Sequence, residues 1–403
     1  MKALLLTNEF PPNVYGGAGV HVEYLSRELA KLMDVEVRCF GEQLDESKPL
    51  TVRGTTVDSS RFADADPRIK PVLSALAHNI DFNVKPSGAD VVHCHTWYSH
   101  FGGIAAKLSY GIPLVITAHS LEPLRPWKRE QLGGGYDFSS WIEKTALEMA
   151  DAVIAVSKET KADLLNNFDI DESKIEMIYN GIDTEEYQCV DTQNCFEKYG
   201  IDPDQPYVLF VGRITRQKGI VHLVNAIKDI DAGCQVVLCA GAPDTPEIAK
   251  EMSDAVDVAR AQRDGIIWIE EMVSKETAIE LYSNAALFCC PSIYEPFGII
   301  NLEAMACETP VVASAVGGIK EVVVHGETGL LVPVEQLKEA PFEPVEPEKF
   351  SSDLAEAINQ LMADPALRER MAAASRARAV ETFSWTAIAE QTAALYKRLN
   401  EDK

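Results

Sequence analysis

The stretch YVLFVGRITRQKG, residues 207–219, decides the fold of this chain. It begins with a short apolar run that is typical of a buried strand, and a glycine-flanked group of cations follows where the next helix is expected to begin. The polar, turn-rich segment 186–206 comes directly before it. Short apolar runs alternate with helix-period segments upstream of that segment, and the alternation restarts at residue 207. This pattern predicts an α/β protein with two doubly wound, Rossmann-like domains.

The length of the chain agrees with this division, because 403 residues exceed the ~100–200 residues of a usual domain. We expect the first domain over 1–195, with strands such as KALLLT, VEVRCF and PLVITA. We expect the second over 196–383, with YVLFVG, CQVVLCAG and LFCC. Three helical segments close the chain, the last one within 384–403. Because open parallel sheets bind ligands at the carboxyl ends of their strands, two such edges can face each other across a cleft.

Composition excludes several kinds of partner. Hydrophobic residues make up 46% of the chain and charged residues 25%, ordinary values for a globular protein. The formal net charge is −25, with no long basic block to offset it, so the surface repels nucleic acid and anionic lipid. The apolar run in MKALLLTNEF is too short for a signal peptide, and no run approaches the ~20 apolar residues of a membrane span. We expect no nucleic-acid or membrane partner.

The nine cysteines point to a reducing compartment. They form no CxxC pair, and most of them lie in apolar, strand-like runs such as VEVRCF and ALFCC. In a chain of this size, such cysteines are interpreted as free thiols that pack as small apolar groups. We therefore expect a cytoplasmic protein.

A glycine-rich loop follows the first predicted strand. In NEFPPNVYGGAGVH, Gly16, Gly17 and Gly19 come just before a predicted helix. Glycine permits close backbone approach, and the N–H groups of a helix N-terminus favour an anion, so the loop is a candidate ligand contact. A plain strand-to-helix turn is the alternative. The loop is not a dinucleotide fingerprint, because Val22 stands where the last glycine of GxGxxG is needed.

Histidines lie in and after two strands of the first predicted domain. His119 follows PLVITA, where it can orient a sugar hydroxyl or simply lie at the surface. His93 and His95 share one strand face in a His-x-His pattern that can bind zinc. No third ligand stands at metal spacing, so packing within the sheet is the favoured interpretation, and no metal is expected.

Arg213, Arg216 and Lys218 cluster at a strand-to-helix turn of the second predicted domain. In a protein of net charge −25, this placement favours phosphate binding over a solvated loop. Arginine binds phosphate oxygens bidentately, and lysine adds a point charge.

The sequence YEPFGIINLE, residues 294–303, places two carboxylates around another strand-to-helix turn. Glu295 ends a strand, Gly298 begins a helix whose N–H groups can hold phosphate, and Glu303 lies further along, where it can accept ribose hydroxyls. Taken alone, the two acids are explained by a helix dipole and by solvent. Together with GRITRQKG, they predict a ligand that contains a sugar, a diphosphate and a nucleoside.

The chain resembles the retaining glycosyltransferases of the GT-B fold, and it is most similar to bacterial glycogen synthases of the short actinobacterial type. The likeness is carried by NEFPPNVYGGAGVH, HCHTWYS, TAHSLEPLRPWKREQLGGGY, YNGID, GRITRQKG and YEPFGIINLEA, within residues 8–304. The resemblance implies that the final helix returns to the first domain. It also implies glycogen biosynthesis, in which an α-glucosyl group passes from ADP-glucose to the non-reducing end of an α-1,4-glucan.

The resemblance implies roles for individual residues. Arg213 and Lys218 would hold the donor diphosphate, which would make a metal or other cofactor unnecessary. Glu295 would contact the transferred glucose, and His119 would bind it and help to align the departing bond. The other expected donor-binding residues are Gly16, Gly17, Asn180, Gly298, Ile299, Ile300 and Glu303. The expected acceptor-binding residues are His95, Trp97, Arg125, Lys128 and Arg129.

Two departures from the longer glycogen and starch synthases affect the acceptor. Val14 and Tyr15 stand where those enzymes have a lysine before the glycine pair, and Thr96 replaces the aspartate of their His-Asp-Trp. The cations of LRPWKRE, beside His119, can bind a phosphorylated acceptor. Short relatives are similar to enzymes that extend glucose-1-phosphate to α-maltose-1-phosphate, and this is the first alternative function. A nucleotide-sugar epimerase and a non-catalytic glycan-binding protein are further alternatives, and UDP-glucose is an alternative donor.

Overall fold

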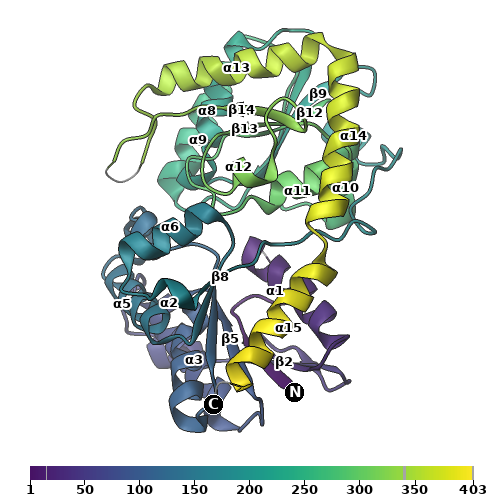
Figure 1. Ribbon diagram of the computed structural model, residues 1–403. Helices are drawn as coiled ribbons and strands as arrows, with labels where there is room; N and C mark the ends of the chain where they lie inside the picture. The colour runs from purple at the N-terminus through teal and green to yellow at the C-terminus, as the bar shows by residue number, and fades with distance from the viewer. Residues whose placement is uncertain (15, 339–341, 402–403) are drawn as a thin grey trace. The chain divides into compact units, whose positions relative to one another are not determined.

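The computed structural model describes residues 1–14, 16–338 and 342–401, so Tyr15, residues 339–341 and residues 402–403 lie outside the described residues. The chain forms two units. The first comprises Met1–Gly181 together with the segment that starts at Trp385, and the second comprises Ile182–Ser384. Each unit contains a sheet of mainly parallel strands with helices on both faces, as Figure 1 shows. The prediction of two doubly wound, Rossmann-like domains is therefore confirmed.

The N-terminal sheet has eight strands in the order β3-β4-β2-β1-β5-β6-β7-β8. Among the described residues, neighbouring strands are parallel apart from the antiparallel β3–β4 pair. The order reverses between β1 and β5, and doubly wound sheets bind ligands at such a switch point. The strands are β1 (Lys2–Leu6), β2 (Asp34–Phe40), β3 (Leu44–Asp45), β4 (Leu50–Thr55), β5 (Val91–His95), β6 (Leu114–Ala118), β7 (Ala152–Ala155) and β8 (Ile175–Met177).

Alternate residues of the central strands enter two different cores, as the two-residue period of a strand requires. Leu5 of β1 packs in one core with Ile388 of the final helix, whereas Leu4 packs in the opposite core with Phe82. Helices α1 and α15 therefore cover one face of this sheet, and α2, α3, α5 and α6 cover the other (Figure 1). The helices are α1 (Gly17–Ala30), α2 (Lys70–Val84), α3 (Trp97–Tyr110), α4 (Lys128–Leu132), α5 (Gly135–Met149), α6 (Lys158–Asn167) and α15 (Trp385–Glu401).

Helix α15 is fixed to the N-terminal unit by aromatic and polar contacts. The Trp385 ring stacks on Tyr24 of α1 with 5.8 Å between ring centroids. The Tyr396 hydroxyl lies 2.6 Å from Nδ1 of His93, in the middle of the sheet. The last helix of the chain thus completes the core of the unit that begins the chain.

The first unit ends at Gly181 rather than near the expected position 195. The polar segment after it packs on the second unit, because it contributes buried aromatic side chains there. Tyr187 donates a hydrogen bond to Glu303, and Phe196 meets Tyr207 edge-to-face at 5.9 Å. The polar composition of this segment did not indicate that Tyr187 and Phe196 are buried in the second unit.

The C-terminal sheet has six strands in the order β11-β10-β9-β12-β13-β14, and each neighbouring pair is parallel. Its switch point lies between β9 and β12. The strands are β9 (Tyr207–Arg213), β10 (Gln235–Gly241), β11 (Ile266–Ile269), β12 (Leu287–Cys290), β13 (Val311–Ser314) and β14 (Gly329–Val332). The helices are α7 (Phe196–Tyr199), α8 (Ile220–Ala226), α9 (Pro246–Arg260), α10 (Lys275–Asn284), α11 (Ile299–Ala306), α12 (Ile319–Val322), α13 (Pro347–Ala363) and α14 (Pro365–Thr382).

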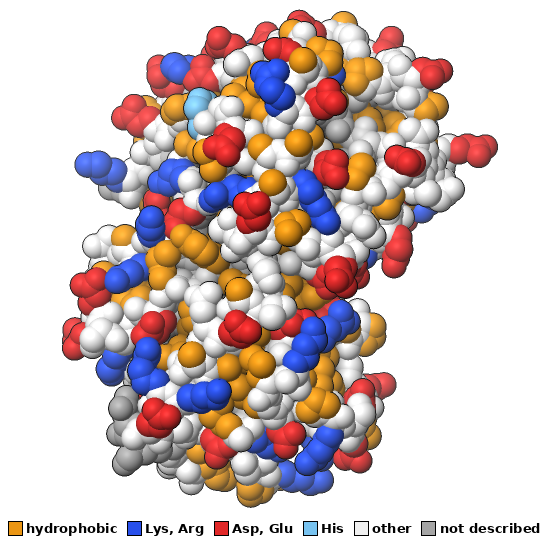
Figure 2. All heavy atoms as spheres, turned by 45° about the vertical axis from the view of Figure 1, so that its right-hand side comes forward, with side chains coloured by type: hydrophobic (Ala, Val, Ile, Leu, Met, Phe, Trp, Pro, Cys, Tyr) orange, Lys and Arg blue, Asp and Glu red, His pale blue; other side chains and the backbone are white. Residues whose placement is uncertain are grey.

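Surface and thiol properties agree with the composition. On the face drawn in Figure 2, acidic side chains lie among basic ones over both units. The nine cysteines are free thiols, and eight of them are buried. Within the described part of the chain, no helix combines the length and apolar character that crossing a membrane requires.

Candidate active site

In the C-terminal unit, the turn after β9 delivers a lysine to the end of β12. Lys218 ends the short helix η4 (Arg216–Lys218), and its Nζ lies 2.6 Å from Oε2 of Glu295. The next residue, Gly219, has φ +59°, and a Cβ there would lie 2.1 Å from the carbonyl oxygen of Pro291. Only glycine permits this close approach, so the local sequence KG holds the cationic turn against the neighbouring strand end.

Glu295 is 7% exposed and is fixed through its backbone as well as its side chain. Its carbonyl oxygen accepts a hydrogen bond from the N–H of Gly318 at 3.0 Å, and a Cβ at Gly317 would lie 1.9 Å from the same oxygen. Burial alone would lower the pKa of Lys218, but the Glu295 carboxylate outweighs burial and raises the pKa above its ordinary value. Lys218 is therefore a charged ammonium group, and its side chain is 21% exposed.

Glu303 lies in the helix that follows this turn, α11. Tyr282 donates a hydrogen bond to its Oε2 at 3.0 Å, and Tyr187 donates to its Oε1 at 3.3 Å. Burial raises the pKa of Glu303, and the two tyrosine hydrogen bonds oppose that shift. Each oxygen is held by one hydroxyl, and each keeps further acceptor capacity for another donor.

The start of α11 provides main-chain donors at the same sheet edge. Gly298 caps the helix with φ +101°, and Ile299 and Ile300 form its first turn. The first N–H groups of a helix have no partner within the helix, so they favour an anion in front of them.

The two arginines of GRITRQKG point to acids of their own unit. Arg213 Nη2 lies 2.5 Å from Oδ1 of Asp244, and Arg216 lies 3.7 Å from Glu251. The structure thus brings Lys218 to Glu295, whereas Arg213 is held beside the end of β10.

In the N-terminal unit, the glycine loop holds an internal carboxylate. The N–H of Gly16 donates to Oε2 of Glu9 at 2.8 Å, and a Cβ at Gly19 would lie 2.8 Å from the same side chain. Gly17 is the first residue of α1. In the structure, the loop is held by the carboxylate of Glu9, and its contact with a ligand stays a prediction.

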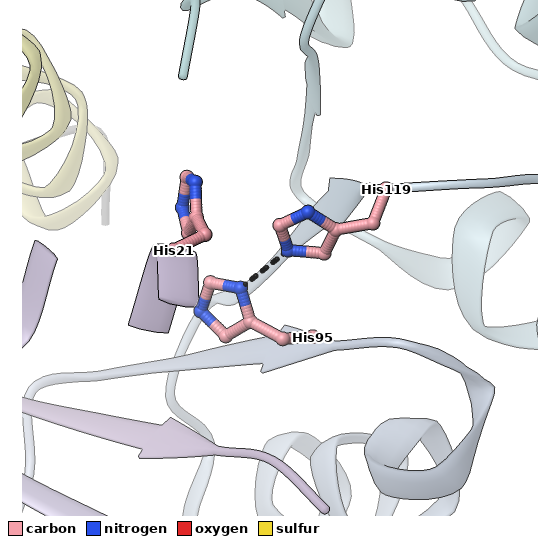
Figure 3. A group of neighbouring side chains, drawn as sticks. All are labelled: His21, His95 and His119. Carbon is pink, nitrogen blue, oxygen red and sulfur yellow. Dashed lines mark hydrogen bonds between the residues drawn. The ribbon is translucent and has the colours of Figure 1, made fainter. Parts of the chain in front are cut away.

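Three histidines from three elements meet at the carboxyl edge of the N-terminal sheet. His21 comes from α1, His95 ends β5, and His119 follows β6. Figure 3 shows their rings turned toward one another, and the dashed line marks the 3.0 Å contact between His95 Nδ1 and His119 Nε2. One ring nitrogen from each residue lies within 4.8 Å of the other two.

Asn180, which follows β8, is connected to this group. Its Oδ1 lies 2.7 Å from Nδ1 of His21. Burial lowers the pKa of His21 to about 4, and burial together with the neighbouring imidazoles lowers the pKa of His95 and of His119 well below the usual 6.5. The three imidazoles are therefore neutral near pH 7.

The His-x-His pair divides between two roles. His93 is buried, with Nδ1 2.6 Å from the Tyr396 hydroxyl and Nε2 2.7 Å from Thr117 Oγ1, so it packs within the sheet as expected. His95 instead joins His119 and His21. The sequence spacing showed no third metal ligand because the partners of His95 come from other elements.

The predicted acceptor-binding residues separate into different environments. Trp97 is 4% exposed and stacks on Tyr98 in a core beside α5, so its ring is away from the surface. Arg129 forms an exposed ion pair with Asp137. Arg125 remains beside His119, since its Nη1 donates to Ser120 Oγ at 3.0 Å.

Lys128 faces a pair of buried glutamates. Its Nζ lies 3.3 Å from Oε1 of Glu122, and Arg125 approaches the same oxygen at 4.0 Å. The N–H of Glu122 donates to Oε2 of Glu143 at 2.7 Å. Burial and the Glu122 charge raise the pKa of Glu143 well above its usual value. Two cations therefore face one carboxylate and a second carboxyl group that binds its proton tightly.

Several residues of these sites were not singled out from the sequence: Glu9, His21, Glu122, Tyr187, Asp244 and Tyr282. Glu9 and Asp244 lie soon after β1 and β10, so the search for polar residues after strands could have found them. His21 lies in the quoted motif GGAGVH. Tyr187 and Tyr282 carry no spacing signal, because a buried tyrosine is common in any core.

Comparisons with known proteins agree with this architecture. The family model "Glycosyltransferase Family 4" matches residues 15–186, and "Glycosyl transferases group 1" matches residues 191–341. The alpha-maltose-1-phosphate synthase of Mycolicibacterium smegmatis is 46% identical over 407 residues, covering 99% of this chain and 100% of that protein. The enzyme of the same name from Mycobacterium tuberculosis has the same identity and coverage. Among solved structures, sucrose-phosphate synthase from Thermosynechococcus elongatus has a TM-score of 0.77 and 26% identity, with 100% of both chains covered.

The two Rossmann-like units and the two family matches define a glycosyltransferase of the GT-B class, and the enzyme is a hexosyltransferase. The chain belongs to the actinobacterial family of these enzymes that includes the alpha-maltose-1-phosphate synthases.

Proposed function

We propose that this enzyme is an α-maltose-1-phosphate synthase. It transfers an α-glucosyl group from ADP-glucose to the 4-hydroxyl of glucose-1-phosphate and retains the configuration of the transferred sugar. The observation that carries the proposal is 46% identity with enzymes of that name over 99% of the chain. These relatives favour a sugar-phosphate acceptor over the glucan acceptor of a glycogen synthase, which the sequence first suggested.

The donor side of the proposal uses the C-terminal unit. Lys218 and the first-turn amides of α11 stabilise the charge that grows on the departing diphosphate, and Arg213 adds a second cation. Groups aimed at charge that develops in the transition state lower the barrier more than groups that bind the ground state. Glu303, whose carboxylate is held by Tyr187 and Tyr282, accepts hydrogen bonds from the ribose hydroxyls. With this positive charge in place, the proposed reaction requires no metal or other cofactor.

Glu295 contacts the transferred glucose, and His119 of the N-terminal unit binds glucose through a neutral imidazole. We favour departure of the diphosphate and attack of the acceptor on one face of the sugar, with the diphosphate taking the proton of the acceptor hydroxyl. Retaining glycosidases use a second carboxyl group about 5–5.5 Å from the first. Glu295 has Lys218 as its close charged partner, which suits sugar binding beside a diphosphate.

The acceptor phosphate is assigned to Arg125 and Lys128. Both cations pair with the Glu122 carboxylate. Because the raised pKa of Glu143 favours its neutral form, two positive charges face one negative charge, and the cluster can accept an anion. Arginine binds phosphate oxygens bidentately. Arg129 was predicted to join them, but its ion pair with Asp137 makes it a weaker candidate. We place the reaction in the cytoplasm, where free thiols persist.

Product analysis tests the proposal. The purified enzyme is supplied with ADP-glucose and either glucose-1-phosphate or glycogen, and parallel reactions contain UDP-glucose. We expect ADP release together with α-maltose-1-phosphate in the glucose-1-phosphate reaction. ADP release with glycogen alone would identify a glucan synthase. Conversion of the donor without an acceptor would identify an epimerase, and the absence of nucleotide release in every reaction would overturn the transferase proposal.

A further inference from the structure

We propose that His21, His95 and His119 form a binding site for Zn²⁺, and that the bound ion inhibits the enzyme by occupying the imidazole assigned to glucose. The three rings come from separate elements and turn toward one another (Figure 3). Imidazole nitrogen is a preferred zinc ligand, and three such ligands with one open position are a recurrent zinc geometry. The metal site itself does not depend on the proposed function, whereas the inhibition does.

Among the described residues, the buried Nε2 atom of His21 has no hydrogen-bond partner. A buried polar atom without a partner costs about 1–3 kcal/mol, so such an atom in a folded protein commonly marks a ligand or an ordered water. His21 is 3% exposed, so bulk water does not explain this atom.

The hydrogen bond to Asn180 prepares His21 for a metal. The Asn180 Oδ1 atom is only an acceptor, so Nδ1 of His21 carries the hydrogen across their 2.7 Å contact. The lone pair of His21 then lies on Nε2, the atom that has no partner. Metal-binding histidines regularly donate a hydrogen bond from their other ring nitrogen to an oxygen, which fixes the tautomer in this way.

His95 and His119 are already near ligand spacing. His95 Nδ1 and His119 Nε2 are 3.0 Å apart. Two nitrogens bound to a tetrahedral zinc ion at 2.0–2.1 Å lie about 3.3 Å apart. The ion therefore needs only a small separation of these rings, and the hydrogen between them moves to the distal nitrogen of its own ring. His21 must approach from within 4.8 Å to complete the set.

The ligand type selects the ion. Three neutral nitrogen ligands suit Zn²⁺ and Co²⁺, whereas Mg²⁺ and Ca²⁺ prefer oxygen ligands. A fourth position remains open for water. Because the bound ion fixes the orientation of the His119 ring and brings its positive charge to the imidazole assigned to glucose, occupation of the site competes with glucose.

Cobalt spectroscopy tests the site independently of activity. The full-length enzyme, treated with EDTA and dialysed, is titrated with Co²⁺ and followed by visible absorption and calorimetry. We expect one Co²⁺ per chain with the intense d–d bands of four-coordinate cobalt, displacement by Zn²⁺ and no displacement by Mg²⁺. His21→Gln and His119→Gln should each weaken binding by at least about tenfold. His325→Gln, at an exposed histidine of the other unit, should bind cobalt like the unaltered enzyme.

Each outcome decides a separate part of the proposal. The site is overturned if the unaltered enzyme takes up no cobalt, if both variants bind cobalt normally, or if near-ultraviolet thiolate bands show a cysteine ligand. Thermal unfolding of each variant checks that it is folded, and His119, which is partly exposed, tolerates replacement best. Zinc should slow ADP release, and EDTA should restore it. Cobalt binding without inhibition would overturn only the competition with glucose, and a lack of transferase activity would leave the cobalt result unchanged.

Discussion

Nζ of Lys218 lies 2.6 Å from Oε2 of Glu295, and the two residues follow adjacent parallel strands, β9 and β12, at the switch point of the C-terminal sheet. Glu295 is buried and Lys218 is partly buried, so removal of the lysine leaves a buried carboxylate without its cation. Any substitution here is expected to change stability and, under the proposed function, also catalysis, so the two effects must be measured separately.

Replacement of Lys218 by alanine is expected to lower kcat by roughly 10²–10³-fold, or about 2.7–4 kcal/mol, by analogy with the loss of one transition-state donor. The melting temperature should also fall, because the Glu295 carboxylate loses its cation. Steady-state kinetics of ADP release and calorimetry measure the two effects. The control is Lys250→Ala, which removes an exposed lysine paired with Asp254 and should change neither quantity. A folded Lys218→Ala enzyme with near-normal kcat would refute the diphosphate role.

Tyr282→Phe is expected to raise the KM for the nucleotide sugar about 10- to 100-fold while kcat changes little, because a hydrogen bond to a charged group contributes ~1.5–3 kcal/mol. The lost hydroxyl normally lowers the pKa of Glu303. The pH below which donor binding weakens should therefore move upward in the variant. Tyr187→Phe is the matched comparison, and its longer 3.3 Å contact predicts a smaller effect. A change in kcat alone would contradict a role in holding the ribose.

Glu143→Gln is expected to raise the melting temperature at about pH 8, and the gain should shrink toward pH 5. The pKa of Glu143 is higher in the folded than in the unfolded chain. The protonated Glu143 side chain therefore contributes to stability at low pH, and this contribution is lost as the pH rises through the pKa of Glu143 in the folded chain. Above that pH the buried carboxylate is charged and destabilises the fold. Calorimetry across this range measures the trend. For Glu148, the Lys144 hydrogen bond lowers the pKa, so Glu148→Gln should show the opposite sign.

Arg125→Ala is expected to raise the KM for glucose-1-phosphate about 10- to 100-fold, the loss of a charged hydrogen bond of ~1.5–3 kcal/mol, with little change in the KM for the donor. Arg129→Ala should leave both constants unchanged, because Arg129 already pairs with Asp137 at the surface. Initial rates with each substrate varied in turn distinguish the two arginines. A larger effect from Arg129→Ala would reverse their assignment.

The parts of the site that could be predicted from sequence are those set by strand order. In a parallel sheet, residues that follow adjacent strands meet at one edge, so Lys218, Glu295 and the start of α11 were expected together from their positions alone. The position of the glycine loop, between the first strand and the first helix, was predicted in the same way. The regular alternation of strands and helices likewise revealed both sheets.

The remaining contacts depend on how side chains are directed after the elements pack. The Arg213 side chain is directed by Asp244, which follows the neighbouring strand β10 and forms an ion pair with it. The spacing of residues in the sequence does not show this pairing. His21, His95 and His119 meet because packing brings His21 of α1 beside the residues that end β5 and follow β6, and no local spacing in the sequence indicates that contact. The unit boundary at Gly181 was missed because Tyr187 and Phe196 are buried within a segment whose other residues are polar.

Trp385 and Tyr396 lie in α15, which follows the whole second unit in sequence, yet they fill the core against α1 and the middle of the first sheet. During translation, the strands of that sheet emerge early, and one of their faces stays uncovered until α15 has been made. The unit that is synthesised first therefore cannot complete its core before the second unit has been synthesised. A truncation or bulky fusion within Trp385–Glu401 should expose apolar surface in the N-terminal unit and make the nascent chain depend on chaperones.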